Sequence, residues 1–261
     1  MFIPLHDANK LKHIRLQWVT LFLMVANVVI WMLTAGAEVT GAGDGLTPYA
    51  SLGFTPIILF DGVPNSVPWL WVPEWASLLT YAFLHGSFWH LAGNMAFLWV
   101  FGDNVEDAMG HFKFLLFYLI CAAAGAFVHG LFDVSSQVPL IGASAAVSGL
   151  VSAYLILHPK VWVWVLVLMR FPVMLPAWLL LGFWIGFQFF QLFAMPEGNV
   201  SFASHIGGLI AGAVLVFLFK RRGQPVLDTR IETPDAVVLA RQPTKTKRVV
   251  VPPVPRKWGR S

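Results

Sequence analysis

The chain has 261 residues, of which 57% are hydrophobic and only 11% are charged, and its formal net charge is +4. A soluble domain normally carries about 25% charged residues, so this composition excludes an ordinary soluble globular protein and indicates an integral membrane protein. The 17 basic residues are separated by long gaps, for example between Arg15 and Lys113. Loops that alternate between the two sides of a membrane produce such gaps, so the basic residues indicate topology and not nucleic-acid binding.

The N-terminal part predicts one membrane helix behind a short cytoplasmic segment. Residues 1–16 are basic, and an apolar run from Trp18 to about Ala35 follows, which is long enough to cross a membrane. The sequence Ala35-Gly36-Ala37 resembles a signal-peptidase site, so a cleaved signal peptide is an alternative. The run exceeds the 7–15 residues of a signal-peptide core, and we therefore predict a retained helix that opens a membrane domain over residues 17–222.

Residues 38–80 contain no convincing span and are rich in glycine, proline and tryptophan. Because tryptophan prefers the headgroup level of a membrane, we predict a long external loop that lies partly in the interface. Three spans follow, at about Ser87 to Phe101, Phe114 to about Leu131, and Ile141 to Leu157.

The last third of the chain predicts two more spans and a tail. Arg170, Pro172 and Pro176 interrupt an apolar stretch of 35 residues, 161–195. We interpret residues 161–165, where Val and Trp alternate, as a short interfacial piece. The fifth span then runs from about Val173 to Phe193 and the sixth from Ala203 to Phe219; the basic, proline-containing tail, 223–261, is predicted to be disordered.

Six spans place both termini in the cytoplasm and every basic residue on the cytoplasmic side. The predicted fold class is therefore all-α, a polytopic membrane protein. The single cysteine, Cys121, lies in an apolar run with nothing beside it that suggests a metal or an activated thiolate, and we expect neither a metal nor a cofactor.

Polar residues inside membrane helices are costly and tend to be functional. Ser144 and His205 lie 16 and 15 residues before the basic residues that end their spans, so both sit roughly 22–24 Å from the cytoplasmic boundary. His90 and Asn94 fall in the outer half and the middle of the second span. These four residues can share one layer if their helices are neighbours.

The four residues of that layer are of the types that catalyse acyl transfer: a nucleophile, a base and hydrogen-bond donors for an oxyanion. A serine hydroxyl becomes a nucleophile when a base such as histidine accepts its proton, and an amide, an imidazole or backbone N–H groups can bind an oxyanion. His90 and Asn94, four residues apart, share one helix face. We find no carboxylate at this depth, so a Ser/His dyad is favoured over a triad. Taken singly, Ser144 could be a packing residue and the histidines could be hydrogen bonds between helices.

At these residues the chain resembles the rhomboid intramembrane serine proteases, over about residues 75–220. Four family motifs occur in the family's order. They are H-x-x-x-N at His90 and Asn94, G-x-x-x-E-x-x-x-G at Gly102, Glu106 and Gly110, the G-x-S of G-x-S-G at Gly142 and Ser144, and H-x-x-G-x-x-x-G at His205, Gly208 and Gly212.

The resemblance implies a six-helix rhomboid-like bundle with Ser144 as nucleophile and His205 as general base. It implies that His90, Asn94 and the Ser144 backbone N–H bind the oxyanion, and that Glu106 is structural. Loop 38–80 would be the first external loop, and the fifth span the lateral gate for substrate helices.

The chain departs from the family at three positions. Ala145 stands where a glycine usually follows the nucleophile, Ser148 replaces an aromatic residue that stacks on the base in some members, and Ser204 stands where alanine is frequent. None of these changes removes a catalytic group. We interpret the histidines at span ends and in loops as interfacial: His85, His111, His129 and His158.

The expected function is that of an intramembrane serine endopeptidase acting on transmembrane protein substrates in the lipid bilayer, with the active site open to the outside of a bacterial inner membrane. One alternative is a rhomboid-like protein that binds or escorts membrane clients with little or no catalysis. Another is a small transporter or channel, which usually shows internal repeats; we find none.

Overall fold

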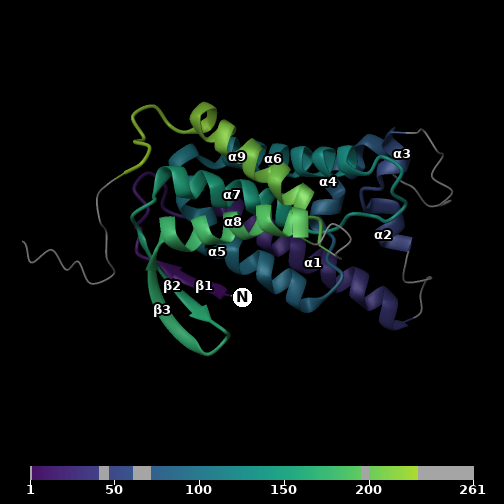
Figure 1. Ribbon diagram of the computed structural model, residues 1–261, viewed down its shortest axis with the longest axis horizontal. Coiled ribbons are helices and arrows are strands. Elements are labelled where there is room, and N and C mark those ends of the chain that lie inside the picture. The colour runs from purple at the N-terminus through teal and green to yellow at the C-terminus, as the bar shows by residue number, and fades with distance from the viewer. Residues whose placement is uncertain (1, 41–46, 61–71, 195–199, 229–261) are drawn as a thin grey trace, which may run out of the picture.

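The computed structural model describes residues 2–40, 47–60, 72–194 and 200–228. Its longer helices run roughly along the long axis of the molecule, with a small sheet at one end and short helices at the other (Figure 1). We call these the sheet end and the loop end. The longer helices are α1 (Trp18–Thr40), α5 (Phe88–Met109), α6 (His111–Phe132), α7 (Ser144–Leu157), α8 (Ala177–Ala194) and α9 (Phe202–Phe219).

Helix α7 forms the centre of the bundle. It packs against α5, α6, α8 and α9, and all of its residues from Ala145 to Tyr154 are buried. Its 14 residues make a helix about 21 Å long, and it begins at Ser144 because the preceding Gly142 adopts a φ of +116°, which a helix does not continue through.

Small residues let α6, α7 and α9 approach closely. A side chain on Gly208 would overlap the backbone carbonyl of Ala145, and one on Gly212 would overlap the backbone of Gly149. The same holds for Gly125 of α6, where a side chain would overlap the methyl group of Ala145. Close packing of this kind is what drives association of apolar helices when no water is expelled.

Among the described residues, four helices are long and apolar enough to cross a membrane: α6, α8, α9 and the Trp18–Ala35 part of α1. Helix α7 is apolar but shorter, and α5 carries Asp103, Glu106 and Asp107 in its last turns. The predicted second and fourth spans are therefore helices, although neither meets both criteria of length and composition.

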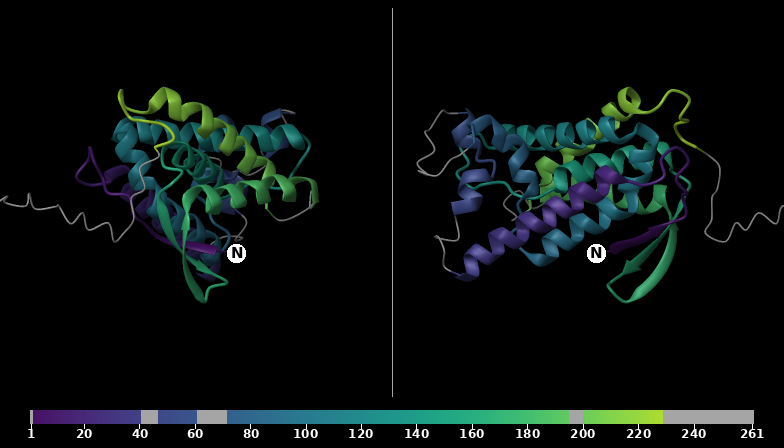
Figure 2. Two further views of the ribbon diagram at one scale, coloured as in Figure 1. Left: turned by 60° about the vertical axis from the view of Figure 1, so that its left-hand side comes forward. Right: turned by 180° about the vertical axis from the view of Figure 1, so that it is seen from behind.

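The sheet end carries an antiparallel sheet of three strands, β1 (Phe2–Asp7), β2 (Trp162–Val167) and β3 (Phe171–Pro176), in the order β1-β2-β3. Figure 2 shows the N-terminal strand β1 beside the β2–β3 hairpin. The expectation of an all-α protein is wrong in this respect, although the fold is mostly helical.

The alternation that we interpreted as an interfacial piece belongs to a strand. Val163 and Val165 are fully buried while Trp164 is 37% exposed, the period of two that a half-buried strand produces. Pro172 and Pro176 lie in β3, at the edge of the sheet, where proline is tolerated. The fifth span accordingly begins at Ala177 and not at Val173.

The N-terminal segment, described from residue 2, is part of the fold, because β1 joins the sheet and the following loop is bonded to α5. Asp107 of α5 accepts hydrogen bonds from the backbone N–H groups of Lys12, His13 and Ile14, at 2.6–3.0 Å. Near the other end of the described chain, the backbone N–H of Leu227 donates to Ile156 of α7 at 2.7 Å. Both ends of the described chain thus lie at the sheet end.

The predicted loop 38–80 contains short helices where the structure describes it. Helix α1 continues to Thr40, and the loop end holds α2 (Thr47–Leu52), α3 (Pro56–Phe60), η1 (Glu74–Ala76) and α4 (Ser77–Thr80), followed by η2 (Tyr81–Phe83). The rest of this loop, 41–46 and 61–71, and most of the predicted disordered tail, 229–261, lie outside the described residues.

Candidate active site

Ser144 and His205 meet between the N-terminal ends of two helices. Ser144 is the first residue of α7, and His205 lies in the first turn of α9, whose N-terminus is capped by the Ser201 side chain. The hydroxyl oxygen of Ser144 lies 2.8 Å from Nε2 of His205. A hydroxyl at a helix N-terminus faces unpaired backbone N–H groups and a partial positive charge that favours a developing anion.

The second ring nitrogen of His205 also has a partner. Its Nδ1 lies 2.9 Å from Oε1 of Gln188, a residue of α8 that is 4% exposed. Trp184, one turn earlier on α8, stacks on the His205 ring with the centroids 6.3 Å apart and the planes at 28°. Phe202 meets the ring edge-on, at 6.0 Å and 89°. Sequence reasoning missed Gln188, although a polar residue in an apolar span was a signal for it.

His90 lies beside the loop that precedes the nucleophile. Ser87 caps α5 by accepting a hydrogen bond from the His90 backbone N–H at 3.2 Å. A Cβ on Gly142 would lie 2.6 Å from Cε1 and Nε2 of the His90 ring, so the ring packs directly on the backbone of Gly142. The Gly142 N–H in turn donates to the carbonyl of Tyr81 at 3.0 Å, which anchors this loop to η2.

The Asn94 amide is held by another histidine. Its Nδ2 donates to Nε2 of His85 at 3.1 Å, and the rings of His85 and His90 lie 5.0 Å apart. His85 is fully buried within the protein. The reason is that the Leu84–Ser87 segment folds back against α5 and carries the ring inward, an arrangement that its position in a loop did not indicate.

The other three histidines also contact protein groups. Nδ1 of His111 pairs with Glu106, and Nδ1 of His129 lies 2.8 Å from the hydroxyl of Ser201. His158 is 5% exposed, with its ring 5.4 Å from that of Tyr154, so it too is buried.

The three departures from the rhomboid motifs have structural explanations. The methyl group of Ala145 faces Gly125 of α6, where the absence of a side chain leaves room for it. The Ser148 hydroxyl donates to the carbonyl of Ser144 at 2.7 Å. The Ser204 hydroxyl donates to the carbonyl of Ser201 at 2.9 Å.

The segment Gly102 to Gly110 joins three helices and stands apart from the dyad. A side chain on Gly102 would lie 3.0 Å from that of Thr20 in α1, and Gly110, with a φ of +86°, forms the turn between α5 and α6. The Glu106 carboxylate accepts hydrogen bonds from the backbone N–H groups of Val19 and Thr20. These contacts are structural, because they fix the start of α1 against α5.

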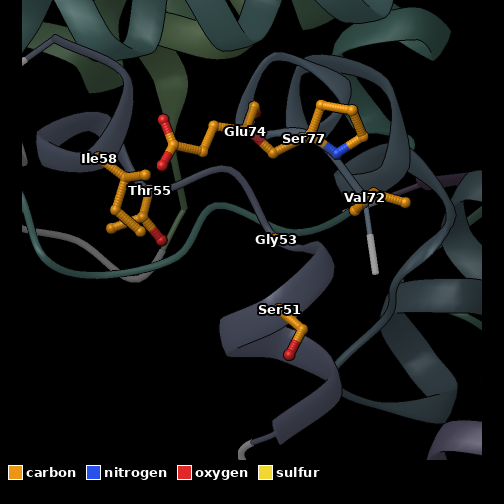
Figure 3. Close-up of a pocket in the computed structure, with 8 residues that line it drawn as sticks. Ser51, Gly53, Thr55, Ile58, Val72, Glu74 and Ser77 are labelled. Carbon is orange, nitrogen blue, oxygen red and sulfur yellow. Dashed lines mark hydrogen bonds between the residues drawn. The ribbon is translucent and has the colours of Figure 1, made fainter. Parts of the chain in front are cut away.

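Two further observations bear on other kinds of site. A hollow at the loop end is lined by residues of α2, α3, η1, the start of α4 and the segments beside them, including Ser51, Thr55, Glu74 and Ser77 (Figure 3). It contains none of the predicted catalytic residues. Over the part of the chain that the structure describes, no group of three or more His, Cys, Asp or Glu residues is placed to hold a metal ion.

Comparisons with known proteins relate the chain to one family. Residues 72–222 match the family model of the Rhomboid domain. The chain is 30% identical over 149 residues to Rhomboid protein 1, mitochondrial, of Saccharomyces cerevisiae, and 34% identical over 139 residues to Rhomboid protease GluP of Bacillus subtilis. Each match covers 53% of this chain, with 40% of the yeast protein and 25% of GluP.

Another relative is matched over almost its entire length. The chain is 26% identical over 235 residues to Putative rhomboid protease YdcA of Bacillus subtilis, which covers 84% of this chain and 96% of YdcA. It spans less than half the length of the yeast protein and of GluP. The matched domain covers more than half of the residues and includes all four motif groups with the helices that carry them. The chain is therefore an integral membrane protein of the rhomboid family.

Proposed function

We propose that this protein is an intramembrane serine endopeptidase that hydrolyses peptide bonds in or near the transmembrane segments of membrane proteins. The observation that carries the proposal is the 2.8 Å contact between the Ser144 hydroxyl and Nε2 of His205. A nucleophile and a base within hydrogen-bond reach, with the base oriented by a third group, are the general signature of covalent acyl transfer.

In the first half of the reaction, Oγ of Ser144 attacks the carbonyl carbon of the scissile bond while its proton moves to Nε2 of His205. The C–N bond then breaks as His205 returns that proton to the leaving amine, which leaves an acyl-enzyme. In the second half, a water molecule gives its proton to His205 and attacks the ester carbonyl. The collapse of this intermediate frees the acid and restores the Ser144 hydroxyl.

The oxyanion formed in each half needs hydrogen-bond donors. The Ser144 backbone N–H is one, since it lies at the start of α7. The His90 ring lies against Gly142, two residues before the nucleophile. Asn94 has two amide hydrogens and gives one to His85, so the second is available to the oxyanion. These residues form the proposed oxyanion site.

The proposed topology has six spans, with both termini in the cytoplasm and the active site open to the outside of a bacterial inner membrane. Both ends of the described chain lie at the sheet end. Ser144 is the first residue of α7, at the end of that helix away from the sheet. A substrate helix would enter between α5 and α8, where Phe97 and Trp184 are in contact with centroids 5.7 Å apart. It must unwind locally, because the backbone hydrogen bonds of a membrane helix are otherwise satisfied.

The test uses the full-length protein, purified in detergent, with a transmembrane model substrate and a serine-directed fluorophosphonate. We expect cleavage and labelling by the native protein and neither by Ser144→Ala. Ser152→Ala is a matched control, because Ser152 lies two turns later on α7 and its hydroxyl donates only to a backbone carbonyl of the same helix, that of Gly149, in the described contacts. Cleavage that survives Ser144→Ala would refute the proposal. A native protein that binds the substrate but neither cleaves it nor reacts would favour a client-binding role.

A further inference from the structure

The catalytic base is held from a helix that contributes no reacting atom. His205 has Ser144 at its Nε2 and Gln188 at its Nδ1, at 2.8 and 2.9 Å. A neutral imidazole carries one N–H donor and one acceptor nitrogen, and the oxygen of an amide can only accept. Since Oε1 of Gln188 faces Nδ1, the ring proton belongs on Nδ1. The lone pair on Nε2 is then directed at the Ser144 hydroxyl.

From this geometry we propose that Gln188 is a positioning residue, which selects the catalytically competent tautomer of His205, and that Trp184 fixes the plane of the same ring. The inference rests on the proposed protease function and deepens it, because it assigns the orientation of the base to α8. Gln188 is then a third group beside the Ser/His dyad that the sequence indicated.

The burial of Gln188 supports this role. Its side chain is 4% exposed within an apolar helix, and burying an amide costs free energy unless it is hydrogen-bonded. A leucine or methionine would fill the same volume without that cost, so the bond to His205 is what the amide contributes. The described hydrogen bonds of the His205 ring go to Gln188 and Ser144, and no described carboxylate is hydrogen-bonded to the ring.

Trp184 supplies the ring contact that Ser148 cannot. Ser148, one turn after the nucleophile, donates its hydroxyl to the carbonyl of Ser144 and presents no aromatic surface. The Trp184 ring stacks on His205 from α8 instead, four residues before Gln188, and residues four apart lie on the same helix face. Stacking limits tilt of the imidazole, and the hydrogen bond limits its rotation in the plane.

The experiment measures kcat, KM and the pH profile of kcat/KM for full-length Gln188→Met and Gln188→Glu on a transmembrane model substrate. Methionine keeps the volume and removes the acceptor, so kcat falls about tenfold, the order expected for one lost hydrogen bond, while KM stays within about twofold. Glutamate keeps the acceptor, so the rate at high pH is largely restored. Its charge favours the imidazolium, so the acidic limb of the profile moves upward by about one pH unit.

Phe190→Met is the matched control on α8, because the Phe190 side chain is exposed and the substituted residue is the same. The inference is overturned if Gln188→Met keeps kcat within about twofold of the native value, or if both Gln188 variants lower kcat equally with an unchanged pH profile. If Gln188→Met does not fold, the pH profile of Gln188→Glu decides alone. A native protein and a Phe190→Met control that neither cleave nor react with the fluorophosphonate would overturn the proposed function itself.

Discussion

Glu106→Gln tests how α5 holds the first membrane helix. Glu106 is fully buried. One carboxylate oxygen accepts the backbone N–H of Thr20 at 2.8 Å and the Thr20 hydroxyl at 2.7 Å, and the other accepts the backbone N–H of Val19 at 3.0 Å. Both N–H groups belong to the first turn of α1, so the carboxylate caps that helix. His111 pairs with the same group.

The magnitude follows from counting donors. Glutamine keeps one acceptor oxygen and has an NH₂ group in place of the other. That NH₂ group then faces a backbone N–H, and because both groups are donors, neither can pair with the other. A buried donor left unpaired costs about 1–3 kcal/mol. Loss of a negative charge at a helix N-terminus costs about 0.3–1 kcal/mol more. We therefore expect Glu106→Gln to lower the free energy of unfolding by about 1–4 kcal/mol.

The assay is reversible unfolding in mixed micelles, followed by tryptophan fluorescence, with Glu74→Gln as the control because Glu74 is exposed at the loop end. Thr20→Val completes a double-mutant cycle, since it removes one donor to the same carboxylate. A loss below about 0.5 kcal/mol, the usual size of a surface substitution, or additive effects of Glu106→Gln and Thr20→Val, would refute the capping argument.

Three other predictions follow from burial and backbone geometry. Burial raises the pKa of Asp7 from 3.8 to about 8; because the folded-state value is the higher one, stability is lost as pH rises from about 4 to about 8, by up to about 1.4 kcal/mol per pH unit. Asp7→Asn should flatten this slope in pH-dependent unfolding, and an unchanged slope would contradict the assignment. Gly212→Ala should destabilise the protein by about 1–3 kcal/mol, because its Cβ overlaps the α7 backbone, whereas Gly182→Ala meets nothing within 4 Å and should not lower the unfolding midpoint. Gly142→Ala should reduce fluorophosphonate labelling at least about tenfold, because about 1–3 kcal/mol of strain at positive φ adds to a clash with the His90 ring; labelling equal to that of Gly182→Ala would count against it.

Hydropathy predicted the positions of the helices well, because it depends on residues close together in the chain. The sequence also predicted that Ser144 and His205 lie at one depth and can meet, and the structure has their side chains hydrogen-bonded. Both results rest on local quantities: the length of an apolar run and the rise per residue of a helix. Small residues on α7 and α9 indicated that these helices approach closely, as they do.

Partners distant in sequence were decided by the tertiary structure. Most of the alternating stretch 161–165 lies in β2, which pairs on one side with the neighbouring β3 and on the other with β1, more than 150 residues earlier; the distant partner could not be read from the stretch itself. His85 is buried because the segment before α5 folds back to meet Asn94. The second nitrogen of His205 has its acceptor on α8, and helix packing alone brings Gln188 there. The sequence by itself indicated a membrane protein and predicted a serine and a histidine at one depth, because hydropathy and helical rise are local. Only the tertiary structure decided what holds that histidine, because a hydrogen bond between helices depends on how they pack and rotate against each other.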